Sequence, residues 1–126
     1  MGKQKEGSLQ ERIQKLIRRR GGIPKKNHGS MIEEPGIPDI TAGYHGIYIG
    51  IEAKVDDNIP TKQQGIHCRN LWKSGNIAFV AWTTEDVNIV LDLVDYYLSQ
   101  LVCIQKLVDC IHNDMLKLNI DDGTRW

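Results

Sequence analysis

A His-Gly dipeptide at residues 45–46 separates two stretches in which apolar and polar side chains alternate, the pattern of a β-hairpin with a two-residue turn. In that register Asp39 stands opposite Glu52, because both residues are equally far from the turn. Residues directly opposite each other in paired strands point to the same face of the sheet. The sequence therefore predicts a hairpin over residues 39–54 that brings two carboxylates together.

The same register gives the hairpin an apolar face and a polar face, because side chains alternate along a strand. The apolar face would carry Ile40, Ala42, Ile47, Ile49, Ile51 and Ala53. The polar face would carry Asp39, Thr41, Tyr48, Gly50, Glu52 and Lys54. A longer loop would shift the register by one residue and turn the two acids to different faces. The pairing of the acids therefore depends on the two-residue turn.

Two carboxylates placed opposite each other repel, and they need a compensating cation. A cluster of carboxylate oxygens favours a hard divalent ion such as Mg²⁺ or Mn²⁺. Lys54 follows Glu52 by two residues and shares its face, so its ammonium group can reach a metal-bound water or a phosphate. This set of groups suits phosphodiester hydrolysis. The alternative interpretation is a surface salt bridge between Lys54 and one of the two acids.

The length and composition of the chain indicate one compact domain. No stretch approaches the ~20 apolar residues of a membrane span, and the polar, basic N-terminus lacks the apolar core of a signal peptide. Cys68, Cys103 and Cys110 cannot all pair within one chain, and free thiols are expected in a reducing compartment. We therefore expect a cytoplasmic protein that makes no membrane contact.

Basic residues are concentrated at the N-terminal end, although the formal net charge of the chain is zero. Residues 1–26 hold nine Lys or Arg and two Glu, a net charge of +7, whereas residues 27–82 carry −2 and residues 83–126 carry −5. A basic end on an otherwise acidic protein is typical of a surface that binds a polyanion such as nucleic acid. The alternative is a solvated basic helix face.

Apolar periodicity predicts the other elements. They are a helix over residues 8–20 with Ser8 as a possible cap, a strand over 23–27, a helix from Thr61 to about Lys73 and a buried strand over 77–82. A long helical region then begins at Thr83 or Thr84, with a possible bend near Gln105. Its apolar stripe is Val87, Leu91, Val94, Leu98, Leu101, Val108 and Met115. This stripe can pack within the chain, or its part over residues 100–120 can form a subunit interface.

Glu6 lies just before the first predicted helix, and Glu11 lies within it. If this helix is extended back by one turn, Glu6 falls three residues before Leu9 and joins the buried stripe, whereas Glu11 faces water. A capping role for Ser8 argues against the extension, so the sequence leaves open whether Glu6 is helical.

The order of a helix, a strand, a hairpin with acids, a helix and a strand is the αβββαβ core of the PD-(D/E)XK nucleases. Here the signature reads Pro38-Asp39, twelve residues, and then Glu52-Ala53-Lys54. Five motifs together resemble the VRR-NUC domain, the virus-type replication-repair nuclease: Glu6-x-x-Leu9-Gln10-x-x-Ile13, Gly21-Gly22, Gly36-Ile37-Pro38-Asp39, Ile51-Glu52-Ala53-Lys54 and Gln64-x-x-His67-x-x-x-Leu71-x-x-x-Gly75. The resemblance spans residues 6 to about 87.

The resemblance implies an α/β fold with a mixed four-stranded sheet flanked by helices. It implies a single domain over residues 1–126, with a core over about 6–98 and a helical C-terminal extension over about 99–126. The implied activity is Mg²⁺- or Mn²⁺-dependent cleavage of branched DNA without an organic cofactor. Stand-alone proteins of this kind resemble phage enzymes that act as homodimers on Holliday junctions, which would place this chain in the cytoplasm of an infected bacterium. The alternatives are a flap or splayed-arm nuclease, a non-catalytic DNA-binding module and a restriction nuclease, although 126 residues leave no room for a recognition domain.

The resemblance also assigns roles to residues. Asp39, Glu52 and the backbone carbonyl of Ala53 would bind the metal, Lys54 would be the catalytic lysine, and Glu6 would complete the metal shell, with Glu11 as its competitor. Gln64 would hold a scissile phosphate or the lysine. Thr61-x-x-Gln64 is also a capping box, so Gln64 has a purely structural alternative.

Sequence-independent affinity for DNA would come from contacts between basic side chains and phosphates. The candidates are Arg18, Arg19, Arg20, Lys25 and Lys26. Trp72, Trp82 and Trp126 are candidates for stacking on bases, but the interpretation preferred for Trp72 and Trp82 is that they belong to the core.

Overall fold

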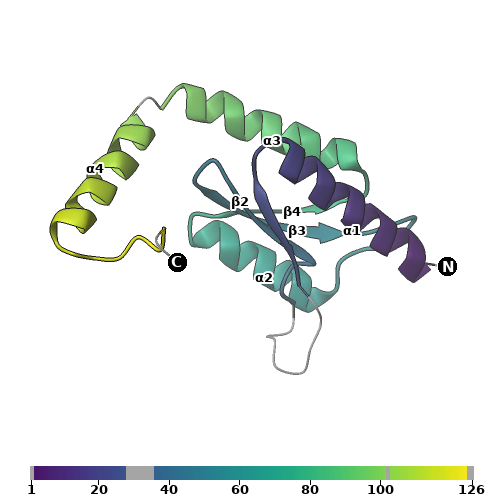
Figure 1. Ribbon diagram of the computed structural model, residues 1–126. Coiled ribbons are helices and arrows are strands. Elements are labelled where there is room, and N and C mark those ends of the chain that lie inside the picture. The colour runs from purple at the N-terminus through teal and green to yellow at the C-terminus, as the bar shows by residue number, and fades with distance from the viewer. Residues whose placement is uncertain (1, 28–35, 102, 125–126) are drawn as a thin grey trace. The chain divides into compact units, whose positions relative to one another are not determined.

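The computed structural model describes residues 2–27, 36–101 and 103–124 of the chain. In chain order the elements are α1 (Gly2–Arg19), β1 (Ile23–Lys26), β2 (Ile40–Tyr44), β3 (Ile47–Ala53), α2 (Lys62–Lys73), β4 (Ile77–Ala81), α3 (Thr84–Ser99) and α4 (Cys103–Lys117), as Figure 1 shows. They fall into two compact units, Met1–Ile89 and Val90–Trp126, and α3 runs across the division. None of the described helices is long and apolar enough to cross a membrane.

The four strands form one mixed sheet in the order β1-β2-β3-β4. β1 pairs with β2 and β2 pairs with β3 in antiparallel fashion, whereas β3 and β4 are parallel. Parallel strands need a crossover connection, which α2 provides between β3 and β4. The predicted α/β class, with a mixed four-stranded sheet flanked by helices, is confirmed.

The β2–β3 hairpin has the predicted register, with Tyr44 opposite Ile47 and Ile40 opposite Ile51. Its turn consists of His45 and Gly46, which both have positive φ angles, of 49° and 85°. Positive φ at both central residues is the geometry of a type I′ turn, whose twist matches that of the flanking strands. The apolar face is buried at Ile40, Ala42, Ile49, Ile51 and Ala53, as expected.

Helix α1 buries Leu9, Ile13, Leu16 and Ile17, the stripe expected from its periodicity. A Cβ on Gly22 would meet both Ile17 and Tyr44, so the end of α1 lies on the same side of the sheet as Tyr44. The helix begins at Gly2, six residues before the proposed cap. Ser8 is therefore inside the helix, where its carbonyl accepts a hydrogen bond from Arg12. This corrects the predicted start and makes Glu6 helical.

Helix α2 covers the opposite, polar face of the hairpin. A Cβ on residue 50 would lie 2.9 Å from Leu71 Cδ1 and 2.9 Å from Pro38 Cγ, which only glycine avoids. This close approach explains why Gly50 stands between Tyr48 and Glu52 on that face. It also means that the polar face is buried at Glu52, with α2 packed over it.

Helix α3 begins as expected, because the Thr83 side chain accepts a hydrogen bond from the Asp86 backbone and Asp86 accepts one from the Thr83 backbone. The long helical region is interrupted between Ser99 and Cys103, so the break lies before the bend expected near Gln105. The stripe is buried at Val87, Leu91 and Val94. It is about half exposed at Leu101 and Val108, 49% and 50% respectively.

Candidate active site

Asp39 immediately precedes β2, and the end of β1 holds its backbone in place. The Asn27 backbone N–H donates to the Asp39 carbonyl at 2.8 Å, and the Asn27 side-chain amide donates to the Pro38 carbonyl at 2.8 Å. Both bonds keep the Pro38-Asp39 segment extended alongside β1. The role of Asn27 was not predicted, although its place as the last residue of the predicted strand over 23–27 was the available signal.

The Asp39 side chain is held by β3. Its Oδ2 atom accepts a hydrogen bond of 3.0 Å from the backbone N–H of Ala53, the residue after Glu52. This bond fixes the carboxylate beside the end of β3, as the hairpin register required. Asp39 and Glu52 therefore lie together, because the Asp39 carboxyl group is close enough to raise the pKa of Glu52.

Glu52 is the buried acid of the site, with 1% of its surface exposed. Its Oε1 atom accepts a hydrogen bond of 2.6 Å from Gln64 Nε2 and lies 3.7 Å from Lys54 Nζ. Its Oε2 atom is also buried and has no hydrogen-bond partner among the described residues. A buried carboxylate oxygen without a partner is costly unless a proton or a cation neutralises the group.

The pKa of Glu52 is raised to about 9, chiefly because burial penalises its charged form. The neighbouring Asp39 carboxyl raises the pKa further, because it can share a proton with Glu52 and repels its negative charge. Lys54 acts in the opposite direction, and repulsion from Glu6 adds to the increase. A buried carboxyl group beside a second acid is stabilised when a proton or a cation binds to it.

Lys54 lies beside Glu52 and is itself largely buried, with 12% of its side chain exposed. Its backbone N–H donates to the Ala81 carbonyl of β4 at 3.0 Å, so the parallel pairing of β3 and β4 positions the residue. The ion pair with Glu52 exists, but burial of both side chains argues against the alternative of a solvated surface salt bridge.

Gln64 forms the predicted capping box and also contacts Glu52, while its predicted role toward a phosphate or the lysine stays a prediction. Its Oε1 atom accepts from the Thr61 backbone at 2.8 Å, and its own backbone N–H donates to Thr61 Oγ1 at 3.2 Å, which completes the predicted capping box. The amide nitrogen of the same side chain donates to Glu52. Gln64 therefore links the first turn of α2 to the buried acid.

Of the two acids on α1, Glu6 lies nearer to the site. It is partly buried, and its charge raises the pKa of Glu52. Glu11 is exposed instead. Among the described residues, no three His, Cys, Asp or Glu side chains gather closely enough to form a metal site alone. A cation at Asp39 and Glu52 would therefore need backbone or water oxygens as further ligands.

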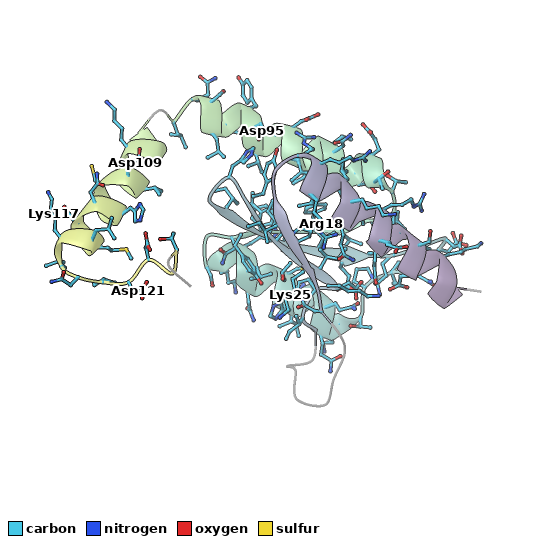
Figure 2. The ribbon with its side chains drawn as sticks, in the orientation of Figure 1. Arg18, Lys25, Asp95, Asp109, Lys117 and Asp121 are labelled. Atoms are coloured by element: carbon cyan, nitrogen blue, oxygen red, sulfur yellow. The ribbon has the colours of Figure 1, made fainter. Side chains whose placement is uncertain are left out.

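The basic residues near the N-terminus do not form one patch. Lys25 pairs with Thr41 and so points to the polar face of the sheet, whereas Lys26 pairs with Ile40 and points to the other face. Figure 2 labels Lys25 on β1 and Arg18 on α1. Arg18 and Lys26 line a hollow of about 490 Å³, called here the α1 hollow, together with Gly7, Glu11, Gln14 and Lys15.

Arg20 differs from the other predicted DNA-binding residues, because it is engaged within the protein. Its guanidinium group donates to the Asn88 side chain at 2.7 Å and to the Asn88 carbonyl at 3.3 Å. It also lies 6.0 Å from the centre of the Tyr44 ring. Arg20 is therefore held within the protein, and its role in binding DNA stays a prediction, whereas Arg18, Arg19, Lys25 and Lys26 are exposed.

Two of the tryptophans are more exposed than the sequence analysis expected. Trp72 on α2 is 56% exposed, and Trp82 after β4 is 41% exposed, so neither belongs to the core. Trp126 lies outside the described residues.

No family model and no curated protein matches the sequence. Solved structures that are similar to the chain include the following two. One, described as a VRR_NUC domain, has 23% sequence identity and a TM-score of 0.60, and the match covers 70% of this chain and 95% of that one. The other, the Holliday junction resolvase Hjc of Archaeoglobus fulgidus, has 18% identity and a TM-score of 0.50, with 61% of this chain and 67% of that chain covered. The chain thus has the fold of these two structures, and the predicted resemblance to a VRR-NUC domain is confirmed at the level of the fold.

Proposed function

We propose that this protein is a divalent-metal-dependent endonuclease that cuts branched DNA. The observation that carries the proposal is the buried Glu52 carboxylate, whose Oε2 atom has no partner among the described residues and lies in a site shared with Asp39 and Lys54. The similarity in fold to a VRR_NUC domain and to a Holliday junction resolvase supports the same chemistry.

The residues present fit a Mg²⁺ or Mn²⁺ ion. Asp39 and Glu52 would hold it with the backbone carbonyl of Ala53, and Glu6 would bind it through water. All these donors are oxygen atoms, which such ions prefer. When bound, the ion supplies an activated water and neutralises charge on the phosphate. The same ion would satisfy the Glu52 oxygen that has no partner.

The protein's own groups would prepare the reaction. Gln64 holds the Glu52 carboxylate in one orientation through a hydrogen bond of 2.6 Å. Lys54 keeps a positive charge close to Glu52, where it can orient the attacking water and stabilise charge that develops on the phosphate. Asp39 is fixed by Ala53, so both acids are preorganised.

Basic residues around α1 and β1 would bind the DNA backbone. Lys15, Arg18 and Lys26 bring three positive charges to the α1 hollow, against the single negative charge of Glu11. Lys25 projects from the edge strand on the face that carries Glu52. Phosphate contacts of this kind give affinity without sequence preference, as a nuclease that selects DNA by structure requires.

A homodimer is the assembly that we propose for cleavage of a four-way junction. Two sites related by two-fold symmetry suit two strands of a symmetric substrate. The second unit carries exposed apolar side chains suited to an interface, namely Leu93, Tyr96, Tyr97, Leu101, Val108, Leu116, Leu118 and Ile120.

Cleavage of four-way, flap, splayed-arm and linear DNA with Mg²⁺, Mn²⁺ or EDTA tests the proposal. We expect metal-dependent cuts near branch points, and we expect Lys54→Ala to abolish cleavage while binding persists. Lys73→Ala, an exposed lysine on α2, is the matched control and should cut normally. Binding without cleavage under every condition would instead indicate a non-catalytic module. Faster cleavage of flap DNA than of the four-way junction would show that a flap is the preferred substrate.

A further inference from the structure

Trp82 lies next to the proposed catalytic lysine, at the end of β4. In the parallel pairing of β3 and β4, Ala53 is opposite Ala81, and the Lys54 backbone donates to the Ala81 carbonyl. Trp82 directly follows Ala81, so its backbone is one residue from the carbonyl that the Lys54 backbone binds. Its side chain is 41% exposed and so lies outside the core.

The indole of Trp82 is held in a fixed orientation. Its Nε1 atom donates to the Asn58 carbonyl at 3.0 Å, which ties the ring to the loop that follows Lys54. The Trp82 backbone N–H donates to Asp86 Oδ2 at 2.9 Å, so the residue is also anchored to the start of α3. A ring held at both ends loses little conformational entropy when a ligand packs against it.

The loop that receives this hydrogen bond presents a second apolar side chain. Asn58 closes a turn onto Val55 with a backbone bond of 3.1 Å, and the next residue, Ile59, is 75% exposed. Ile59 and Trp82 are thus two exposed apolar side chains on segments joined by the Trp82–Asn58 hydrogen bond. In a site that would bind a phosphodiester, the flat apolar group next to the phosphate is a nucleobase.

We propose that Trp82 is a platform on which a nucleobase next to the scissile phosphate stacks. This inference rests on the proposed nuclease function and adds to it that the preferred substrate has a base with a free face at the cut. A base within a continuous duplex is covered by its neighbours on both faces, so it cannot lie on the indole. A base at a fork or a branch point has a free face, and stacking on an aromatic side chain accepts any base.

Binding in EDTA separates this inference from catalysis. Fluorescence anisotropy would compare a splayed-arm substrate with a fully paired duplex of the same length, for the unmodified protein, Trp82→Ala, Trp82→Phe, Trp82→Leu and Trp72→Ala. We expect Trp82→Ala and Trp82→Leu to weaken splayed-arm binding by about 5- to 100-fold and to change duplex binding less than about twofold. Trp72→Ala is the matched control on an exposed tryptophan of α2, and it should bind both substrates normally.

Trp82→Phe distinguishes stacking from positioning of the loop. Phenylalanine keeps a planar ring but has no group to bond the Asn58 carbonyl, so a stacking role predicts that splayed-arm binding largely recovers. Quenching of 2-aminopurine placed beside the cut should follow the same order, with strong quenching only by proteins that have a ring at position 82.

The inference is overturned if Trp82→Phe binds as weakly as Trp82→Ala, or if fork and duplex lose affinity equally. Thermal unfolding of each variant checks that the fold is kept. If Trp82→Ala does not fold, the comparison of Trp82→Phe with Trp82→Leu decides the question. If no metal supports cleavage but the fork-specific loss is found, the stacking platform stands and the nuclease proposal fails.

Discussion

The pKa of the Glu52 carboxyl group is raised to about 9, first by burial and then by Asp39, so the site favours a proton on this group when no cation is bound. The folded-state pKa lies above the ordinary value of 4.5. The folded protein therefore holds this proton more tightly than the unfolded chain, which adds to the free energy of unfolding. The contribution is complete below pH 4.5 and is lost as the pH rises through about 9. A divalent ion binds the charged form, so it must displace the proton.

Metal binding should therefore release a proton from Glu52. Between about pH 6.5 and about pH 8, Mn²⁺ affinity should rise up to about tenfold per pH unit, because each bound ion displaces about one proton. Isothermal titration calorimetry in two buffers with different ionisation enthalpies measures this release. Glu11→Gln serves as the control and should release the same number of protons. A binding enthalpy that is the same in both buffers would contradict the prediction.

Glu6 and Glu11 differ in their distance from the site, and their substitution should separate them. Glu6→Gln removes a charge that the Glu52 carboxyl senses, and we expect a loss of cleavage of about 10-fold or more if Glu6 helps to hold the metal. Glu11→Gln removes a negative charge from the α1 hollow, so cleavage should persist and DNA binding should tighten slightly. Initial rates at saturating Mn²⁺ measure the difference, and a greater loss for Glu11→Gln would reverse our assignment.

At the scale of the elements, the first turn of α2 combines a helix cap with support for the site. Thr61 and Gln64 form the capping box, and only Gln64 also contacts Glu52. Thr61→Ala and Gln64→Ala should each destabilise the protein by about 1 kcal/mol through loss of the cap. Only Gln64→Ala should also lower the cleavage rate, because Glu52 loses its amide donor. Thermal unfolding measures the loss of stability in both variants, and single-turnover kinetics measures their cleavage rates. Equal cleavage rates would show that Gln64 acts only in the helix cap.

The elements that could be predicted from the sequence are those whose pattern has one physical interpretation. Alternation around residues 45–46 indicates both the hairpin and its register, because a shift by one residue would expose Ile49 and Ile51. The register in turn placed Asp39 beside Glu52. The roles of these acids in catalysis remain predictions.

Other features depend on partners that are far away in sequence. Arg20 resembles its neighbours on a basic helix, but its guanidinium binds Asn88, 68 positions later. Ser8 resembles a helix cap, but the helix continues through it to Gly2. Trp82 resembles a core residue at the end of an apolar strand, yet it is 41% exposed, and the chain bends directly after β4. Local patterns do not contain this information.

At the scale of the whole molecule, the basic residues are concentrated within residues 1–26 although the net charge of the chain is zero, which favours the proposed binding of DNA. Affinity for DNA should therefore fall steeply as salt is added, since each phosphate contact contributes about −0.9 to the slope of log K against log salt. Replacing Lys15, Arg18 and Lys26 together with Gln should reduce the magnitude of this slope by up to about 2.7. Anisotropy titrations in EDTA measure it, with Lys62→Gln, Lys73→Gln and Lys106→Gln combined as a control of equal charge. A slope unchanged by the first set would remove the α1 hollow from the DNA-binding surface.

The exposed apolar side chains of the second unit predict the assembly state of the chain. Val108 and Leu116 on α4 are 50% and 48% exposed, so glutamate at both positions would disturb an interface between subunits more than the fold of one chain. Light scattering at micromolar concentration should give about twice the chain mass of 14.3 kDa. The double variant Val108→Glu and Leu116→Glu should have the mass of a single chain. Ile23→Glu, on a β1 residue that is 80% exposed, controls for the added charge and should leave a dimer. A monomer before substitution would contradict the interface, and cleavage of a four-way junction would then require two chains to meet on the DNA.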